Sequence, residues 1–202
     1  MVFRKHLTRA GIDRAVVYAV SARLWSLFSS LVMMTLILRY LTAEEQGYYY
    51  TFSSIIAAQI LLELGLGVVV TQFASHSMAK LTWTADGLVV GDLEEKQRLS
   101  SLIKLTVRWY AILGGVFVAV LGPLGWLFLD HADPTTTVQW KAAWVWLILA
   151  AAANLVALPL LSLLEGCGRV TDVSNIRLRQ SIAGCLVSWA VIWLGGGLFA
   201  LP

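Results

Sequence analysis

Two charged side chains lie deep inside long apolar runs near the start of the sequence. Arg23 belongs to the run 15–38 and Glu63 to the run 49–70, and the short polar segment RYLTAEEQG joins the two runs. A charge inside a membrane-spanning helix is costly, so it commonly serves a substrate or ion pathway or pairs with another charge. These two residues are therefore the first candidates for function.

Helix geometry predicts that both charges lie at a similar depth. Arg23 is about 12 Å along its helix from Ala15, and Glu63 is about 10 Å from the same end of an antiparallel helix. We expect an Arg–Glu pair or a polar cavity between the two helices. The alternatives are a bridge that only holds the helices together, or an arginine that reaches the lipid headgroups.

Small and polar residues share the faces of these charges. Ser26 and Ser30 follow Arg23 at helical spacing, and Gln59 precedes Glu63 by one turn. We expect Arg23, Ser26, Ser30 and Gln59 to line a substrate cavity. For Glu63 we expect a structural role or a role in ion coupling.

The run 142–164 supplies one more cavity candidate, Asn154, together with Pro159. Proline removes a backbone hydrogen bond from a helix, and transporters place substrate sites at broken helices. The pair therefore suggests a local break in this run. For a single proline, however, a tolerated kink is the favoured interpretation.

Few other residues resemble a catalytic or metal-binding group. Asp130, His131 and Asp133 lie in the short polar segment DHADPTTTVQ, where a solvated loop is the simpler interpretation. Cys167 and Cys185 form no CxxC pair, and the sequence contains no P-loop, GxSxG or HExxH motif. We therefore predict no catalytic residues, no metal site, no cofactor and no enzymatic activity.

Composition predicts the fold class. Hydrophobic residues make up 58% of the 202 residues, charged residues only 13%, and the mean hydropathy is +0.75. Soluble domains carry about 25% charged residues, and about 20 apolar residues cross a bilayer as a helix. We predict an all-α polytopic membrane helix bundle, a single transmembrane domain over 1–202, with spans at about 15–38, 49–70, 105–129, 142–164 and 182–201.

The polar connection 71–104 has its own predicted structure. Asp86-Gly87 between two β-prone pieces predicts a small hairpin. Asp92, followed three residues later by Glu95, is typical of a capped helix start. We expect a short amphipathic helix on the membrane surface that leads into the third span.

The basic residues predict the orientation. Most lysines and arginines fall in the N-terminal segment and in the connections 71–108 and 165–180, whereas Arg39 and Lys141 fall on the opposite side. The positive-inside rule therefore places the N-terminus and the two long connections in the cytoplasm. This distribution accounts for the net charge of +3, so we predict membrane lipid and no nucleic acid as a partner.

Several segments resemble one family of bacterial membrane transporters. They are Arg39, Leu41, Gly47 and Tyr49 in the first turn, the element Glu63-Leu64-Gly65-Leu66, and the connections GDLEEKQRLSSLIKL and LLEGCGRVTDVSNIRLRQ. Taken in order, they resemble the polysaccharide transporters, the O-antigen and lipid-linked oligosaccharide flippases of the multidrug/oligosaccharidyl-lipid/polysaccharide exporter superfamily. Glu63 stands where that family often has an aspartate.

The resemblance implies two six-helix lobes around a central cavity that works by alternating access. The implied substrate is an undecaprenyl-pyrophosphate-linked glycan, flipped from the inner to the outer leaflet of the bacterial inner membrane, with Arg23 attracting its anionic part. Five spans form an incomplete N-terminal lobe, so we expect this chain to be part of a longer one. The alternatives are a non-transporting assembly subunit that binds polysaccharide-synthesis proteins, and a membrane enzyme that uses Asp130–Asp133.

Overall fold

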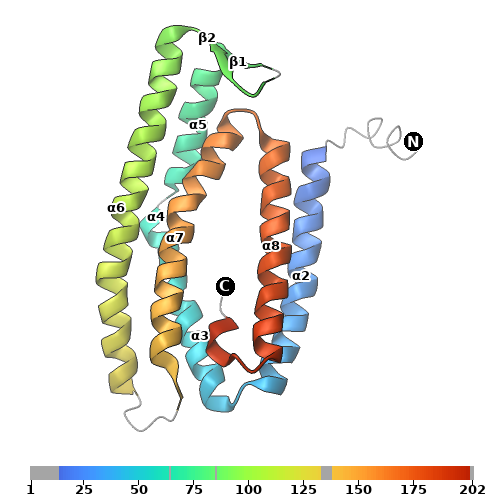
Figure 1. Ribbon diagram of the computed structural model, residues 1–202, viewed down its shortest axis with the longest axis vertical. Helices are drawn as coiled ribbons and strands as arrows, with labels where there is room; N and C mark the ends of the chain where they lie inside the picture. Colours follow the sequence, from blue (N-terminus) through green and yellow to red (C-terminus); the bar gives the residue numbers. More distant parts are fainter. Residues whose placement is uncertain (1–13, 64, 85, 133–137, 201–202) are drawn as a thin grey trace, which may run out of the picture. The chain divides into compact units, whose positions relative to one another are not determined.

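Helices dominate the computed structural model of the chain, which describes residues 14–63, 65–84, 86–132 and 138–200. Within these ranges the only sheet is a two-stranded hairpin (Figure 1). The chain divides into two compact units. One combines the stretch ending at Gln46 with Arg169–Ala200, and the other is Gly47–Gly168. The all-α prediction is confirmed.

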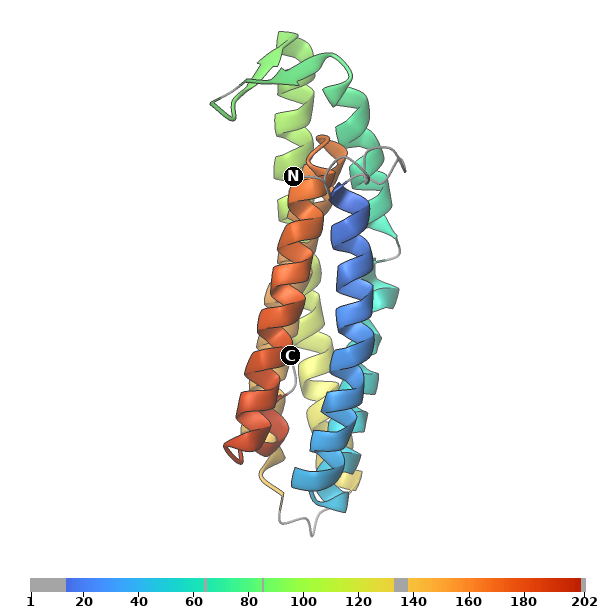
Figure 2. The ribbon, with the colours of Figure 1, turned by 90° about the vertical axis from the view of Figure 1, so that its right-hand side faces the viewer.

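The first unit is a helix pair. Helix α2 (Arg14–Tyr40) lies along helix α8 (Val170–Trp193), and the short 3-10 helix η1 (Gly197–Ala200) packs against the end of α8. Figures 1 and 2 show that α2 and α8 run in the same direction. Their shared face contains Trp25 and Trp189, whose ring centroids are 5.9 Å apart. Apolar helix faces and aromatic contacts therefore hold this unit together.

The turn after α2 is fixed by side chains that satisfy helix ends. The backbone N–H of Thr42 donates to Glu45 Oε2 at 2.8 Å, and the Glu45 N–H donates to Thr42 Oγ1 at 3.2 Å. This reciprocal pair is a capping box, and it starts helix α3 (Ala43–Ala57). Gln46 Nε2 donates to the Leu41 carbonyl at 3.0 Å. The polar segment RYLTAEEQG is therefore a tight connection, as its length predicts.

The second unit contains most of α3, helices α4 (Gln59–Glu63), α5 (Leu66–Met78), α6 (Leu93–Ala132) and α7 (Trp140–Gly166), and strands β1 (Leu81–Trp83) and β2 (Val89–Gly91). Helix α7 packs against both α5 and α6. It runs antiparallel to α6 (Figure 1). Its buried residues include Trp144 and Leu155, so the face of α7 toward its neighbours forms much of the core.

The predicted hairpin is confirmed. Strands β1 and β2 pair antiparallel with Thr82 opposite Val90, and Gly87 takes a φ of 77° in the turn. A positive φ favours glycine, which explains why the sequence has Asp86-Gly87 at this turn. The Trp83 indole N–H donates to the Cys167 carbonyl at 2.8 Å, so the hairpin is fastened to the end of α7.

The predicted amphipathic helix begins where expected and leads into the third span, but it is not a short helix of its own. Asp92 Oδ1 accepts the Glu94 N–H at 2.9 Å and caps the helix. The helix then continues without interruption for 40 residues, from Leu93 to Ala132. Forty residues span about 60 Å, roughly twice the hydrocarbon thickness. The amphipathic residues are thus the extramembrane beginning of the spanning helix itself.

Three of the described helices are long and apolar enough to cross a membrane, within Val16–Tyr40, Leu93–His131 and Trp140–Gly166. A fourth span is formed if the bent pair Ala43–Leu61 and Leu66–Met78 counts as one, with a bend of 42°. The expected span 182–201 is not in this set, because α8 begins in the polar segment at Val170 and ends at Trp193. The composition and these helices are those of a membrane protein.

Candidate functional site

The polar residues predicted on α2 share one exposed side of the helix. Arg23, Ser26 and Ser30 are all exposed, whereas Ser29, one position from Ser30, is 6% exposed. Helix α8 therefore packs on a different face of α2. Within the described part of its own unit, Arg23 forms no ion pair. The structure leaves its guanidinium accessible on an otherwise apolar helix.

The second predicted run is broken rather than continuous. Helix α3 ends at Ala57, α4 covers only five residues, and α5 begins after Gly65, which has a φ of 73°. The left-handed conformation at Gly65 stops the regular α-helical hydrogen-bond pattern, since L-residues with side chains rarely adopt it. The run predicted as one straight span is therefore a helix with a break beside Glu63.

Glu63 lies half-buried next to a narrow gap at Gly67. A Cβ atom placed on Gly67 would lie 3.0 Å from Glu63 Oε1 and 3.1 Å from Ser162 Oγ, so both side chains reach the space that this glycine leaves open. The Thr71 hydroxyl is a hydrogen-bond donor to two backbone carbonyls, that of Gly67 at 3.0 Å and that of Ser162 at 3.1 Å. These contacts join α5 to α7 at the level of the break.

A buried tyrosine adds to this polar cluster. Tyr110 on α6 is 1% exposed, and its hydroxyl has no hydrogen-bond partner among the described residues. The hydroxyl lies within electrostatic range of the Glu63 carboxylate. Four helices thus contribute to one polar region around the break, which we call the Glu63 cluster: Glu63, Gly67, Thr71, Tyr110 and Ser162. An unpartnered buried hydroxyl is uncommon in proteins and is a mark of functional or strained sites.

The sequence predicts only part of this cluster. Glu63 stands out because a charge deep inside an apolar run is costly. Ser162, Thr71 and Tyr110 were missed, since single hydroxyls in apolar runs carry no signal of their own. Gln59 lies half-buried on α4, one turn before Glu63.

The remaining candidates on α7 do not join the Glu63 cluster. Asn154 is exposed and lies about 12 Å along the helix from Ser162. Pro159 is buried inside α7, which continues unbroken from Trp140 to Gly166. The helix therefore tolerates Pro159, which is the favoured interpretation of a single proline, and no substrate-site break forms there. The chain breaks at Gly65 instead.

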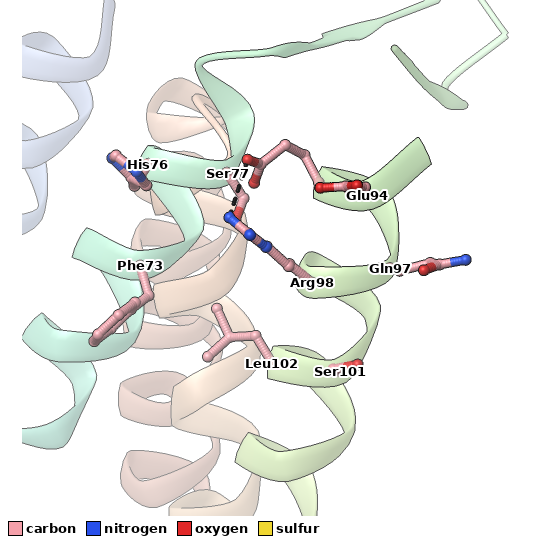
Figure 3. Close-up of a pocket in the computed structure, with 9 residues that line it drawn as sticks. Phe73, His76, Ser77, Glu94, Gln97, Arg98, Ser101 and Leu102 are labelled. Atoms are coloured by element: carbon pink, nitrogen blue, oxygen red, sulfur yellow. Dashed lines mark hydrogen bonds and ion pairs between the residues drawn. The ribbon is translucent and has the colours of Figure 1, made fainter. Parts of the chain in front are cut away.

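A second polar feature lies at the end of the unit that carries the hairpin. There a groove of about 690 Å³ opens between the end of α5 and the start of α6. Figure 3 shows Arg98 and Leu102 of α6 turned toward α5, which presents Phe73, His76 and Ser77. The groove is apolar at its inner end, near Phe73 and Leu102, and charged near the hairpin.

One buried carboxylate organises the charged part of this groove. Glu95 is 3% exposed, and its Oε1 accepts from Lys80 Nζ at 3.1 Å and from Arg98 at 3.3 Å. Its Oε2 is buried and has no hydrogen-bond partner among the described residues. The spacing of Asp92 and Glu95 predicts that Glu95 caps the helix. In the structure Glu95 forms ion pairs with Lys80 and Arg98 instead.

The segment around Asp130 has surface chemistry. Asp130 Oδ1 lies 3.3 Å from Lys141 Nζ, with both side chains exposed, and His131 Nδ1 is 2.8 Å from the Leu127 carbonyl. Asp133 lies outside the described residues. In the described part of the chain, no group of three or more His, Cys, Asp or Glu residues is placed to hold a metal ion.

Two polar regions therefore stand out in the second unit: the Glu63 cluster at the helix break, and the groove around Glu95. Comparisons of the chain with protein-family models, with curated proteins and with solved structures found no match.

Proposed function

We propose that this protein belongs to a membrane transporter that flips an undecaprenyl-pyrophosphate-linked glycan from the inner to the outer leaflet of the bacterial inner membrane. In this proposal the chain forms five spans of an N-terminal lobe, with the N-terminus in the cytoplasm. Further helices, from the same chain or from a partner, complete the cavity. Transport then proceeds by alternating access.

The helix break beside Glu63 carries this proposal. Transporters of several folds use discontinuous helices near the middle of the bilayer, where the freed backbone groups and nearby polar side chains bind substrates and coupling ions. Here a left-handed glycine interrupts an apolar run next to a half-buried carboxylate. Such a break leaves backbone groups without their helical partners, and nearby polar side chains or a bound ligand can satisfy them.

Arg23 has the chemistry for the substrate. A guanidinium carries five N–H donors in a planar fork and binds phosphate oxygens bidentately. Its exposure on α2, together with Ser26 and Ser30 on the same side, leaves these donors accessible. In the proposed mechanism Arg23 attracts the pyrophosphate. Glu63 either stabilises the broken helix or takes up the coupling ion.

Deleting the gene in its own host tests the function. We expect loss of surface glycan and accumulation of the lipid-linked precursor on the inner leaflet, both reversed by the wild-type gene. The Arg23→Ala variant is expected to reduce export at least about tenfold, because it removes a charge-assisted bond to phosphate, whereas Arg23→Lys retains part of the activity. Arg179→Ala, which removes an exposed arginine of the same unit, is the matched control.

The outcomes separate the alternatives. Unchanged surface glycan after deletion would show that the flippase proposal is wrong. Normal export by Arg23→Ala in a host that needs the gene would remove Arg23 from the cavity and favour an assembly subunit.

A further inference from the structure

We propose that the groove between α5 and α6 binds the headgroup of a membrane aminophospholipid, with its phosphate at Arg98 and Lys80 and its ammonium at the carboxylates of Glu94 and Glu95. This binding site is independent of the proposed transport. It rests on the position of the groove, its balance of charges and an unsatisfied carboxylate oxygen.

The position of the groove matches a membrane–water interface. Helix α6 is about twice as long as the hydrocarbon is thick, and its most apolar part is 105–129, so residues from Leu93 to about Lys104 project out of the lipid core. The inner end of the groove is lined by Phe73 of α5 and Leu102 of α6, and Figure 3 shows Leu102 turned toward α5. Acyl chains fit the apolar end and a headgroup fits the charged end.

The charges of the groove favour a zwitterion over an anion. Lys80 and Arg98 supply two positive charges, and Glu94 and Glu95 supply two negative charges, all at the hairpin end of α5 and α6. An anionic headgroup would pair with the two cations and would bring no cation for the two carboxylates. A phosphate and an ammonium on one ligand match both signs, and complementarity of this kind gives specificity.

The cations retain donors for a phosphate. Each of them uses one described ion pair, with Glu95 Oε1, while their side chains stay 62% and 66% exposed. A lysine ammonium has three N–H donors and a guanidinium has five. The buried carboxylate therefore holds two cations in place at the mouth of the groove, with most of their donors directed elsewhere.

Glu95 Oε2 identifies the second half of the ligand. This oxygen is buried without a partner, and leaving a buried carboxylate oxygen unsatisfied is costly. The Arg98 side chain is exposed, so a bound phosphate that draws its guanidinium outward would open a path to Glu95. A primary ammonium then donates to Oε2. A choline headgroup has no N–H to donate, and its usual recognition by several aromatic faces is not available here, since Phe73 is the aromatic side chain among the described lining residues.

Lipid binding to the purified full chain tests the proposal. The delipidated protein is titrated with dioleoyl-phosphatidylethanolamine, dioleoyl-phosphatidylcholine or dioleoyl-phosphatidylglycerol, and bound lipid is counted by native mass spectrometry. We expect the ethanolamine lipid to bind at least about tenfold more tightly than the choline lipid, as charged hydrogen bonds are worth this much. Equal binding of these two lipids, or tighter binding of the glycerol lipid, would overturn the proposal.

Variants locate the site and separate the source of the headgroup. Arg98→Gln and Glu95→Gln are expected to abolish the preference, whereas Lys104→Gln, an exposed charge on the same helix outside the groove, retains it. If Glu95→Gln does not fold, Glu94→Gln takes its place, because Glu94 is exposed and its loss leaves the ion pairs intact. An excess of soluble phosphoethanolamine should not displace the lipid. Displacement would show that the groove takes the free headgroup and that the membrane lipid is not its ligand.

Discussion

At the residue scale, glycines determine how closely the helices of the second unit approach one another. A Cβ atom on Gly125 would lie 2.1 Å from the Trp144 ring, and one on Gly166 would lie 2.5 Å from the Thr71 carbonyl. Gly115, on the same helix as Gly125, has nothing within 4 Å of the same position. Small residues allow close helix packing in membranes, but only some of these glycines are needed for it.

The substitution Gly125→Ala should therefore destabilise the protein. Overpacking a close contact costs about 1–3 kcal/mol, and the rigid Trp144 ring is 1% exposed and its indole donates to the Gly122 carbonyl at 3.1 Å. The measurement is unfolding in SDS–detergent mixtures. Gly115→Ala is the control and should be neutral or slightly stabilising. Equal effects of the two substitutions would contradict the contact with Trp144.

The reactivity of Cys167 gives a second residue-scale prediction. Cys167 is 8% exposed, and burial raises the pKa of its thiol. A raised pKa keeps the thiol protonated at neutral pH, and only the thiolate reacts. In a Cys185→Ala background, maleimide labelling should be slow at pH 7 and should accelerate as the pH rises toward and above the usual thiol value of about 8.5. Labelling at pH 7 as fast as in SDS-unfolded protein would show that this thiol is accessible.

At the scale of elements, the second apolar run is divided into helices α3 and α5, which are separated by the five-residue helix α4. Gly65 accounts for the break, because its φ of 73° is open to glycine and costly for other residues. The Thr71 hydroxyl donates to the Ser162 carbonyl and joins α5 to α7 near the break. The proline in α7 has no comparable effect, since its helix continues around it.

Substitutions at Gly65 should follow backbone preference rather than size. Gly65→Ala is expected to cost about 1–2 kcal/mol, the penalty of a left-handed L-residue, and Gly65→Asn less, because asparagine tolerates this region. A Cβ atom at Gly65 would lie in open space, so steric clashes do not contribute to the change in stability. Thermal unfolding in detergent ranks the variants, with Gly47→Ala as the control. A ranking of alanine above asparagine would contradict the left-handed conformation.

At the scale of the whole molecule, the chain consists of two units that carry different candidate residues. Arg23 lies in the unit of α2 and α8, and Glu63 lies in the unit of α3 to α7. Their similar depth in antiparallel runs is a prediction from helix rise. Their pairing likewise stays a prediction.

Charge reversal tests this pairing. Arg23→Glu and Glu63→Arg should each lower the yield of monodisperse protein in size-exclusion chromatography, because each places two like charges together in a low-dielectric region. The double variant should recover the yield if the residues pair. Recovered folding without recovered glycan export would give the pair a role in transport. A double variant no better than the single ones would show that the residues do not interact.

The sequence by itself determined the membrane class, the approximate limits of α2 and α7, the turn at RYLTAEEQG and the hairpin at Asp86-Gly87. These features depend on composition, periodicity and local turn chemistry, all of which can be read directly from the sequence. Only the tertiary structure decided that α6 is one long helix, that the run around Glu63 is broken, and that Glu95 holds Lys80 and Arg98. It also brought Tyr110 and Ser162 toward Glu63. The physical reason is that the role of an isolated hydroxyl, glycine or carboxylate depends on the residues that surround it. Those residues are distant in sequence and become neighbours only when the helices pack.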